Sequence, residues 1–145
     1  MAQHWLILYK GKYVGRPLDE DKSNKPKPIK LLPYYARQDE IEWVLDGDDT
    51  NGFTASIRDA PTAPGPPPEP DDKVFALLND PEKAEKWYFQ PVPEQGEHRY
   101  IILTNDQSEN WVAPEEEGSQ ILCKQVTAPY LPHSIFEVKK AKPLE

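Results

Sequence analysis

The chain has 145 residues, with 25 acidic and 17 basic side chains, a net charge of -8 and a single cysteine. This length suits one domain that buries a real hydrophobic core, and one cysteine excludes an intrachain disulfide. The negative charge disfavours nucleic acid or an anionic membrane as partner. No apolar run is long enough for a signal peptide or a membrane span, so a cytoplasmic protein is expected.

Short strands with alternating polar and apolar residues are expected along the first third of the chain. They fall at residues 4–10, 13–16, 28–32 and 41–46. A long polar connection, residues 18–28, joins the second strand to the third, and we call it the candidate loop. Pro17, Pro26 and Pro28 restrict its backbone to extended conformations. It is either an ordinary surface connection or a preordered segment that binds a partner at little entropic cost.

The central third carries a strong hairpin-turn dipeptide, Asn51-Gly52, and strands are expected at residues 53–58, 73–78 and 86–90. Prolines crowd residues 60–72 and cannot donate ladder hydrogen bonds. A strand there is expected to be missing or irregular, and the segment to be a flexible insertion, with an SH3-type ligand as the alternative. The one helix candidate is residues 81–86, with Asp80 as N-cap and Pro81 at the first helical position.

The last third repeats the plan of the first, with strands expected at residues 99–104, 110–113, 120–126 and 134–139. Trp43 lies 44 residues before Trp87, which lies 49 before Phe136; Trp5 to Tyr100 is 95 residues and Tyr13 to Trp111 is 98. Three units of about 48 residues follow, near 1–50, 51–95 and 96–145. Because closure removes strand edges, one all-β domain with a closed or nearly closed antiparallel barrel is expected. The threefold plan resembles a β-trefoil, which implies a six-stranded barrel with a hairpin cap.

Signatures of catalysis are missing from the sequence. There is no Gly-rich phosphate loop, nucleophile elbow or His-Glu-x-x-His, so neither an enzyme nor a cofactor is expected. Cys123 lies in an apolar strand without an activating base and should be inert. Residues 46–50 hold three aspartates, but the calcium-loop template fails at its sixth and twelfth positions. An acidic hairpin turn is expected there, and no metal site.

A single Gln-x-Trp match, Gln3-His4-Trp5, leaves a carbohydrate-binding trefoil as a minor alternative. More of the sequence resembles the mushroom serine-protease inhibitors of the cospin and cnispin type. The agreement includes Tyr13-Val14-Gly15-Arg16, Glu20-Asp21, Ser23, Pro26-Lys27, Ile29 and Leu32-Pro33, and continues more weakly at Trp43, Trp111-Val112, Gln120-Ile121 and residues 136–138.

This resemblance implies a trefoil that offers a substrate-like loop to a trypsin-type serine protease. An asparagine carries primary specificity in one family member, and the matching position here is Asn24 or Lys25. The peptide bond between Lys22 and Ser23 is also open to attack if exposed. Lys22, Ser23, Asn24 and Lys25 are therefore the candidate protease-binding residues, and a lysine would pair with the carboxylate of a trypsin-like pocket. The sequence does not choose among them.

Other members of that family use the loop between the last two strands, here residues 127–133. It holds no basic residue. Tyr130 or Leu131 would suit a hydrophobic specificity pocket, while a Tyr130 packed into the protein is the alternative. The expected partner is a serine protease, bound by a monomer. Cysteine-protease inhibitors that share the trefoil keep that protease class open as well.

Overall fold

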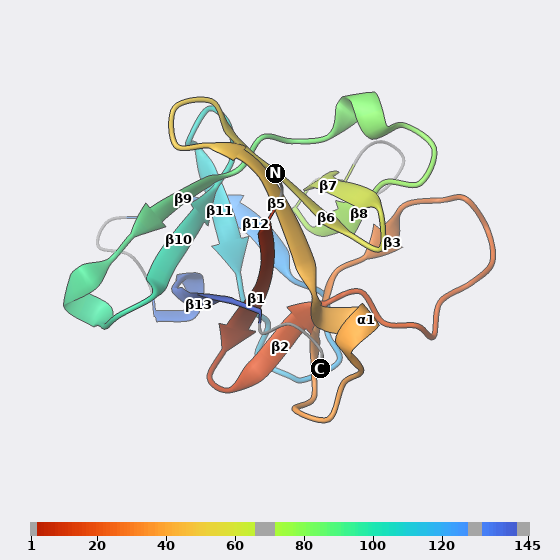
Figure 1. Ribbon diagram of the computed structural model, residues 1–145, viewed down its shortest axis with the longest axis horizontal. Helices are drawn as coiled ribbons and strands as arrows, with labels where there is room; N and C mark the ends of the chain where they lie inside the picture. The colour runs from red at the N-terminus through yellow and green to blue at the C-terminus, as the bar shows by residue number, and fades with distance from the viewer. Residues whose placement is uncertain (1–2, 66–71, 128–131, 142–145) are drawn as a thin grey trace.

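The computed structural model describes residues 3–65, 72–127 and 132–141 of the chain. Figure 1 shows its strands in chain order, from red at the N-terminus to blue at the C-terminus. They are β1 (Gln3–Tyr9), β2 (Lys12–Gly15), β3 (Lys27–Pro28), β4 (Lys30–Leu32), β5 (Trp43–Asp48), β6 (Gly52–Ile57), β7 (Ala60–Pro64), β8 (Val74–Ala76), β9 (Tyr88–Pro91), β10 (Arg99–Leu103), β11 (Glu109–Val112), β12 (Leu122–Gln125) and β13 (Phe136–Lys140).

Six of these strands close into an antiparallel barrel. β1 pairs with β5 and with β13, β5 pairs with β6, and β10 pairs with β9 and with β13. Reciprocal backbone hydrogen bonds of 2.8 Å between Phe53 and Trp87 join β6 to the start of β9 and complete the ring. The barrel therefore leaves none of these strands with an open edge.

Three hairpins cover one end of this barrel. They are β2 with β4, β7 with β8, and β11 with β12. Contacts between β3 and β8, and isolated bridges from Lys30 to Gln120 and from Lys73 to Leu122, tie the hairpins to one another. A six-stranded barrel with a three-hairpin cap is a β-trefoil, so the expected all-β class and fold are confirmed.

Aromatic side chains from all three units meet in the core. Trp43, Trp87 and Phe136 are fully buried, as is Trp111 from the cap strand β11. The ring of Trp111 lies 5.7 Å from Trp43, 5.3 Å from Trp87 and 6.2 Å from Phe136, centroid to centroid. Tilted and edge-to-face packing of this kind adds to the area that the rings bury. The repeat of aromatic residues thus marks one shared core.

The expected match between Tyr13 and Trp111 is wrong by one residue. Tyr13 pairs with Leu8, and Asn110 pairs with Leu103 in the same place of the third unit. Tyr13 therefore corresponds to Asn110, and the buried Val14 corresponds to Trp111. A slip of one residue exchanges the two faces of a strand.

The Pro-rich segment also departs from expectation, because residues 60–64 form the regular strand β7 with partners on both sides. Pro61 cannot donate a hydrogen bond, but its carbonyl accepts one of 2.7 Å from the Leu77 amide. Thr62 is fully buried and donates from its hydroxyl to the carbonyl of Ala55 at 2.8 Å. A proline removes only a donor, so the flexible insertion is wrong for these residues. Residues 66–71 of the expected insertion lie outside the described residues.

Helices are short throughout the described residues. The expected helix shrinks to η1 (Pro81–Lys83), and the Asp80 side chain does not cap it. Three further short helices were not predicted, namely α1 (Gln38–Ile41), η2 (Pro93–Gln95) and η3 (Pro132–Ser134). Ile41, expected to begin a strand, instead ends α1. None of the helices in the described ranges is long and apolar enough to span a membrane.

Candidate functional site

The candidate loop leaves the body of the protein between β2 and β3 and projects into solvent, at the right of Figure 1. Lys22, Ser23, Asn24 and Lys25 are all exposed. The side chains of Lys22, Asn24 and Lys25 form no hydrogen bond or ion pair with any described residue. All four candidate residues thus lie together on one protruding, accessible segment.

The backbone of this segment is bent at residues 22–25, whereas the prolines led us to expect an extended course. Asp21 causes the bend, because one of its carboxylate oxygens accepts from the Ser23 amide at 2.9 Å and from the Ser23 hydroxyl at 2.5 Å. The Ser23 hydroxyl in turn accepts from the Lys25 amide at 3.3 Å. Short polar side chains compete in this way with extended backbone.

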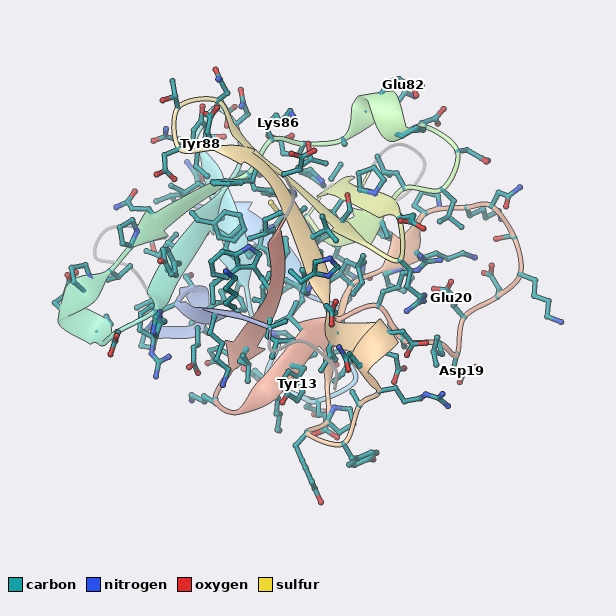
Figure 2. The ribbon with its side chains drawn as sticks, viewed as in Figure 1. Tyr13, Asp19, Glu20, Glu82, Lys86 and Tyr88 are labelled. Atoms are coloured by element: carbon teal, nitrogen blue, oxygen red, sulfur yellow. The ribbon has the colours of Figure 1, made fainter. Side chains whose placement is uncertain are left out.

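Two arginines hold the start of the candidate loop. Arg16 is buried and donates to both carboxylate oxygens of Glu20, at 2.6 and 3.1 Å. Arg58, from the turn between β6 and β7, donates to the carbonyls of Arg16 at 2.7 Å and Pro17 at 3.2 Å. Burial and the nearby Arg16 lower the pKa of Arg58, and Glu20 lies 3.8 Å from Arg58 as a shared counter-charge. Glu20 and its neighbour Asp19 both lie at this root (Figure 2).

Helix α1 supports the same root from the side. The Arg16 amide donates to the Glu40 carbonyl at 2.9 Å, and the Leu18 amide donates to the Glu40 carboxylate at 2.8 Å. Gly15 makes this close approach possible, because a Cβ at that position would lie 2.0 Å from the Glu40 carbonyl oxygen. Close packing against α1 therefore requires a glycine at this position of the Tyr13-Val14-Gly15-Arg16 sequence.

A buried lysine holds the other end of the candidate loop. Lys27 is 2% exposed. Its Nζ donates to the carbonyl of Asp21 at 2.9 Å, to the Asp21 carboxylate, and to the Ser23 hydroxyl at 3.3 Å. The hydrogen bonds from Lys27 and Ser23 hold the pKa of the Asp21 carboxyl well below its usual range. Lys27 thus connects the two sides of the exposed segment through its side chain.

Sequence reasoning missed these anchors. Lys27 lies in the polar connection that was expected at the surface, and Arg58 and Glu40 lie far along the chain from it. One local feature could have indicated that Lys27 is buried. In extended backbone, residues two apart point to the same side, and the residue two positions after Lys27 is the fully buried Ile29. Nothing local identified Arg58, because its role depends on a turn in another unit.

The second candidate loop, residues 127–133, is described only at its two ends. Tyr130 and Leu131 lie outside the described residues. The described part continues with η3, where the carbonyl of His133 accepts from the Ala113 amide at 2.8 Å. That contact fixes the end of the loop against β11. The proposal of a hydrophobic specificity residue here stays a prediction.

Two further expectations concerned chemistry, and the structure confirms both. Cys123 is fully buried, and desolvation raises the pKa of its thiol, so it is not a nucleophile. The acidic residues near Asp48 form the turn between β5 and β6, where the Asp48 carboxylate accepts from the amides of Thr50 at 2.9 Å and Asn51 at 2.7 Å. These hydrogen bonds lower the pKa of the Asp48 carboxyl, and the bond from the Asn51 amide has the largest effect.

Comparison with known proteins decides the family. The family model described as Peptidase inhibitor I66 matches residues 4–140. The chain belongs to this family. It is a family of peptidase inhibitors and not of enzymes, as the missing catalytic signatures led us to expect. A curated relative from Lentinula edodes, named "Serine protease inhibitor", is 38% identical over 120 residues, which cover 81% of this chain and 78% of the relative.

Solved structures agree with the I66 assignment. A proteinase inhibitor from Coprinopsis cinerea superposes with a TM-score of 0.84 at 27% identity, covering 97% of this chain and 99% of that one. The designed threefold-symmetric protein ThreeFoil gives a TM-score of 0.73 at 10% identity, covering 95% and 99% of the two chains. At so low an identity the second match shows the fold alone. The expected resemblance to mushroom protease inhibitors is confirmed.

Proposed function

We propose that this I66 inhibitor blocks a trypsin-like serine protease by placing residues 22–25 of the candidate loop in the protease active site. The observation that carries the proposal is an exposed segment with free lysine side chains, held at both ends by buried cations. The name of the Lentinula edodes relative supports a serine protease as target. Lys22 and Lys25 support trypsin-like specificity, because such pockets carry a carboxylate.

Anchoring gives the candidate loop the rigidity that tight binding requires. Arg16, Arg58 and Glu40 fix its start, and Lys27 fixes its end. A segment that is already ordered loses little conformational entropy when it binds, so more of the contact energy appears as affinity. Protease–inhibitor complexes of ordinary size are among the tightest known for this reason.

The hydrogen bonds favour Lys22 as the residue that enters the specificity pocket. Its neighbours Asp21 and Ser23 are both held by Lys27, so the backbone of Lys22 is fixed while its side chain stays free. Lys25, in contrast, is followed by Pro26, which has no N–H and makes the next peptide bond a poor substrate. The resemblance indicates Asn24 or Lys25 instead, and variants of all three residues decide among them.

Lys27 also gives a physical account of slow hydrolysis. When the protease serine attacks the Lys22 carbonyl, the bond to the Ser23 nitrogen breaks and Ser23 becomes the leaving amine. The contacts of Lys27 with Asp21 and Ser23 span that bond and keep the amine beside the acyl-enzyme. The amine can then attack the acyl carbon, release the protease serine and re-form the peptide bond before water does. High effective concentration of a retained group favours this reversal.

Titration of trypsin, chymotrypsin and papain with the purified protein tests the proposal. We expect near-stoichiometric inhibition of trypsin and no effect on papain. Lys22→Ala should weaken trypsin inhibition by more than about thirtyfold, because a charge pair in a desolvated pocket is lost. Lys139→Ala, an exposed lysine on β13, is the matched control and should leave inhibition unchanged.

Each result has a distinct meaning. Trypsin activity that is unaffected by the wild-type protein would overturn the trypsin assignment, and inhibition of papain alone would indicate a cysteine protease as target. Full inhibition by Lys22→Ala with loss in Asn24→Ala or Lys25→Ala would move the specificity residue within the candidate loop. Full inhibition by all three variants would exclude the candidate loop itself.

A further inference from the structure

Exposed large hydrophobic side chains are concentrated at the root of the candidate loop and in the turn next to it. In the described part of the chain they are Leu18, Tyr34 and Tyr35, with exposed fractions of 42%, 78% and 72%. The rings of Tyr34 and Tyr35 contact each other edge to face, 5.4 Å between centroids, and neither is buried in the core. Exposed aromatic clusters of this kind mark interaction surfaces.

Leu18 is the first residue of the candidate loop, and the two tyrosines lie next to it through a shared anchor. Tyr34 and Tyr35 lie in a turn at residues 33–37, the tyrosine turn, which is closed by a hydrogen bond of 3.0 Å from the Ala36 amide to the Pro33 carbonyl. One carboxylate, that of Glu40, accepts from the Leu18 amide at 2.8 Å and from the Arg37 amide at 2.9 Å. The root of the candidate loop and the end of the tyrosine turn are therefore fixed side by side.

Area explains why the candidate loop needs a neighbouring surface. A protease–inhibitor interface buries about 800 Å² on each partner and involves about 20–30 residues a side. The longest continuously exposed stretch of the candidate loop, residues 21–25, is only five residues. Most of the contact area must therefore come from surface that flanks it.

Two flanks are available in the described structure, and their chemistry differs. One is the connection from β8 to η1, where Leu78, Asn79 and Asp80 line a hollow together with residues 23–26; Glu82 and Lys83 follow on η1. The other is Leu18 with the tyrosine turn. Interface centres are enriched in tyrosine and arginine and depleted in aspartate, glutamate and lysine. The second flank fits that composition, and Arg37 is exposed there too.

We infer that Leu18, Tyr34 and Tyr35 form a second contact with the same protease, on its surface beside the active-site cleft. This inference rests on the proposed function. The candidate loop supplies the residue for the specificity pocket, and the tyrosines supply rigid, amphipathic contact area at low cost in side-chain entropy. The shared Glu40 anchor keeps the two contacts in a fixed relation.

The test measures inhibition constants of Tyr34→Ala/Tyr35→Ala against trypsin, next to the wild-type protein. We expect inhibition weaker by about tenfold or more, as truncation of buried interface tyrosines normally costs. The ratio of cleaved to intact candidate loop at equilibrium should not change, since Lys27 and its partners are untouched. Glu82→Ala/Lys83→Ala on the opposite flank is the matched control, with a change below about twofold expected, as for rim charges. All these residues are exposed, and an unchanged melting temperature verifies folding.

Failure of this inference and failure of the proposed function are separable. If the wild-type protein does not inhibit trypsin, the proposed function fails first. If it does and the double tyrosine variant inhibits equally well, the second contact is refuted. Size-exclusion chromatography of the wild-type protein and the double tyrosine variant tests whether a second copy of this chain binds the tyrosines instead. If the wild-type protein self-associates, the variant does not, and both inhibit trypsin equally, the surface is a contact between copies and the inference is refuted.

Discussion

Two turns of this protein have the same local chemistry and different connections to the fold. Each contains an Asp-x-Ser sequence: Asp21 to Ser23 in the candidate loop, and Asp106 to Ser108 between β10 and β11. In each, the aspartate accepts from the amide and the hydroxyl of the serine, at 2.9 and 2.5 Å in the first and 3.0 and 2.7 Å in the second. The local motif thus makes the same pair of side-chain hydrogen bonds twice.

The third donor distinguishes the turns. Asp106 accepts from the Thr104 hydroxyl at 2.8 Å, two residues away on the same hairpin. Asp21 accepts from Lys27, six residues away and buried against the cap. A short hairpin is held by its own strands and needs no further support. The long connection has no such strands beside it, so a buried cation ties it to the body.

Removing the third donor in each turn should give the largest contrast. Lys27→Met takes away the long-range tie and should raise the ratio of cleaved to intact candidate loop with trypsin by about tenfold or more, because hydrogen bonds to a charged group are lost. Thr104→Val removes only hydrogen bonds within its own hairpin, to Asp106 and Glu109, and should leave this ratio unchanged. Mass spectrometry of the equilibrated complexes measures both ratios.

Folding of the Lys27→Met variant should be preserved. Replacing a buried charge by an apolar side chain of similar size is often neutral for stability, and Asp21 remains exposed to water. Urea unfolding checks this. Equal cleavage ratios in the wild-type protein and Lys27→Met, with both folded, would show that the tie does not protect the loop.

Removing the aspartates should produce the next largest difference. Asp21→Ala leaves the Lys27 ammonium buried without its carboxylate, and a buried charge that loses its partner is strongly destabilising. Asp106→Ala removes an acceptor from hydroxyl and amide groups near the surface. The free energy of unfolding in urea should therefore fall more for Asp21→Ala; a fall of the same size in both would contradict the special role of Lys27.

Acid titration should separate the two turns further. Hydrogen bonds, from Lys27 and Ser23 for Asp21 and from Ser108 for Asp106, lower the pKa of both carboxyls. A lowered pKa in the folded protein means stabilisation that is present above the unfolded value, about 3.9, and lost as pH falls through the folded value. Carboxyl NMR should show Asp21 ionised well below pH 3.9.

Lys27→Met is the control for that titration. It should raise the pKa of Asp21 toward its ordinary value and leave that of Asp106 where it was. An Asp21 midpoint that does not move in this variant would mean that Ser23, and not the buried lysine, sets the titration.

The smallest effects are expected from the serines. Ser23→Ala removes the hydroxyl that Lys27 and Asp21 share but keeps the backbone hydrogen bond to Asp21. A few-fold rise in loop cleavage by trypsin should follow, smaller than that of Lys27→Met, because Lys27 keeps both of its contacts with Asp21. Ser108→Ala should show no change in the same assay. A rise in both would point to a general loosening of the protein.

Much of the candidate site was accessible from the sequence. The length of the connection, its charged residues and the flanking prolines placed residues 22–25 on the surface, because strongly polar segments stay in water. The bend was not foreseen, since three prolines outweighed an Asp-x-Ser pair that competes locally with extended backbone. The anchors Arg58 and Glu40 had no local signal, because their partners are distant in the chain.

The sequence by itself determined the threefold repeat, the aromatic residues of the core and the place of the protruding loop. Each follows from a local pattern, namely alternation, turn residues and spacing. Only the tertiary structure decided that Lys27 is buried, that residues 60–64 form a strand, and that Val14 instead of Tyr13 corresponds to Trp111. These depend on strand register and on partners from other units, and pairing between distant segments leaves no mark in a single stretch of sequence.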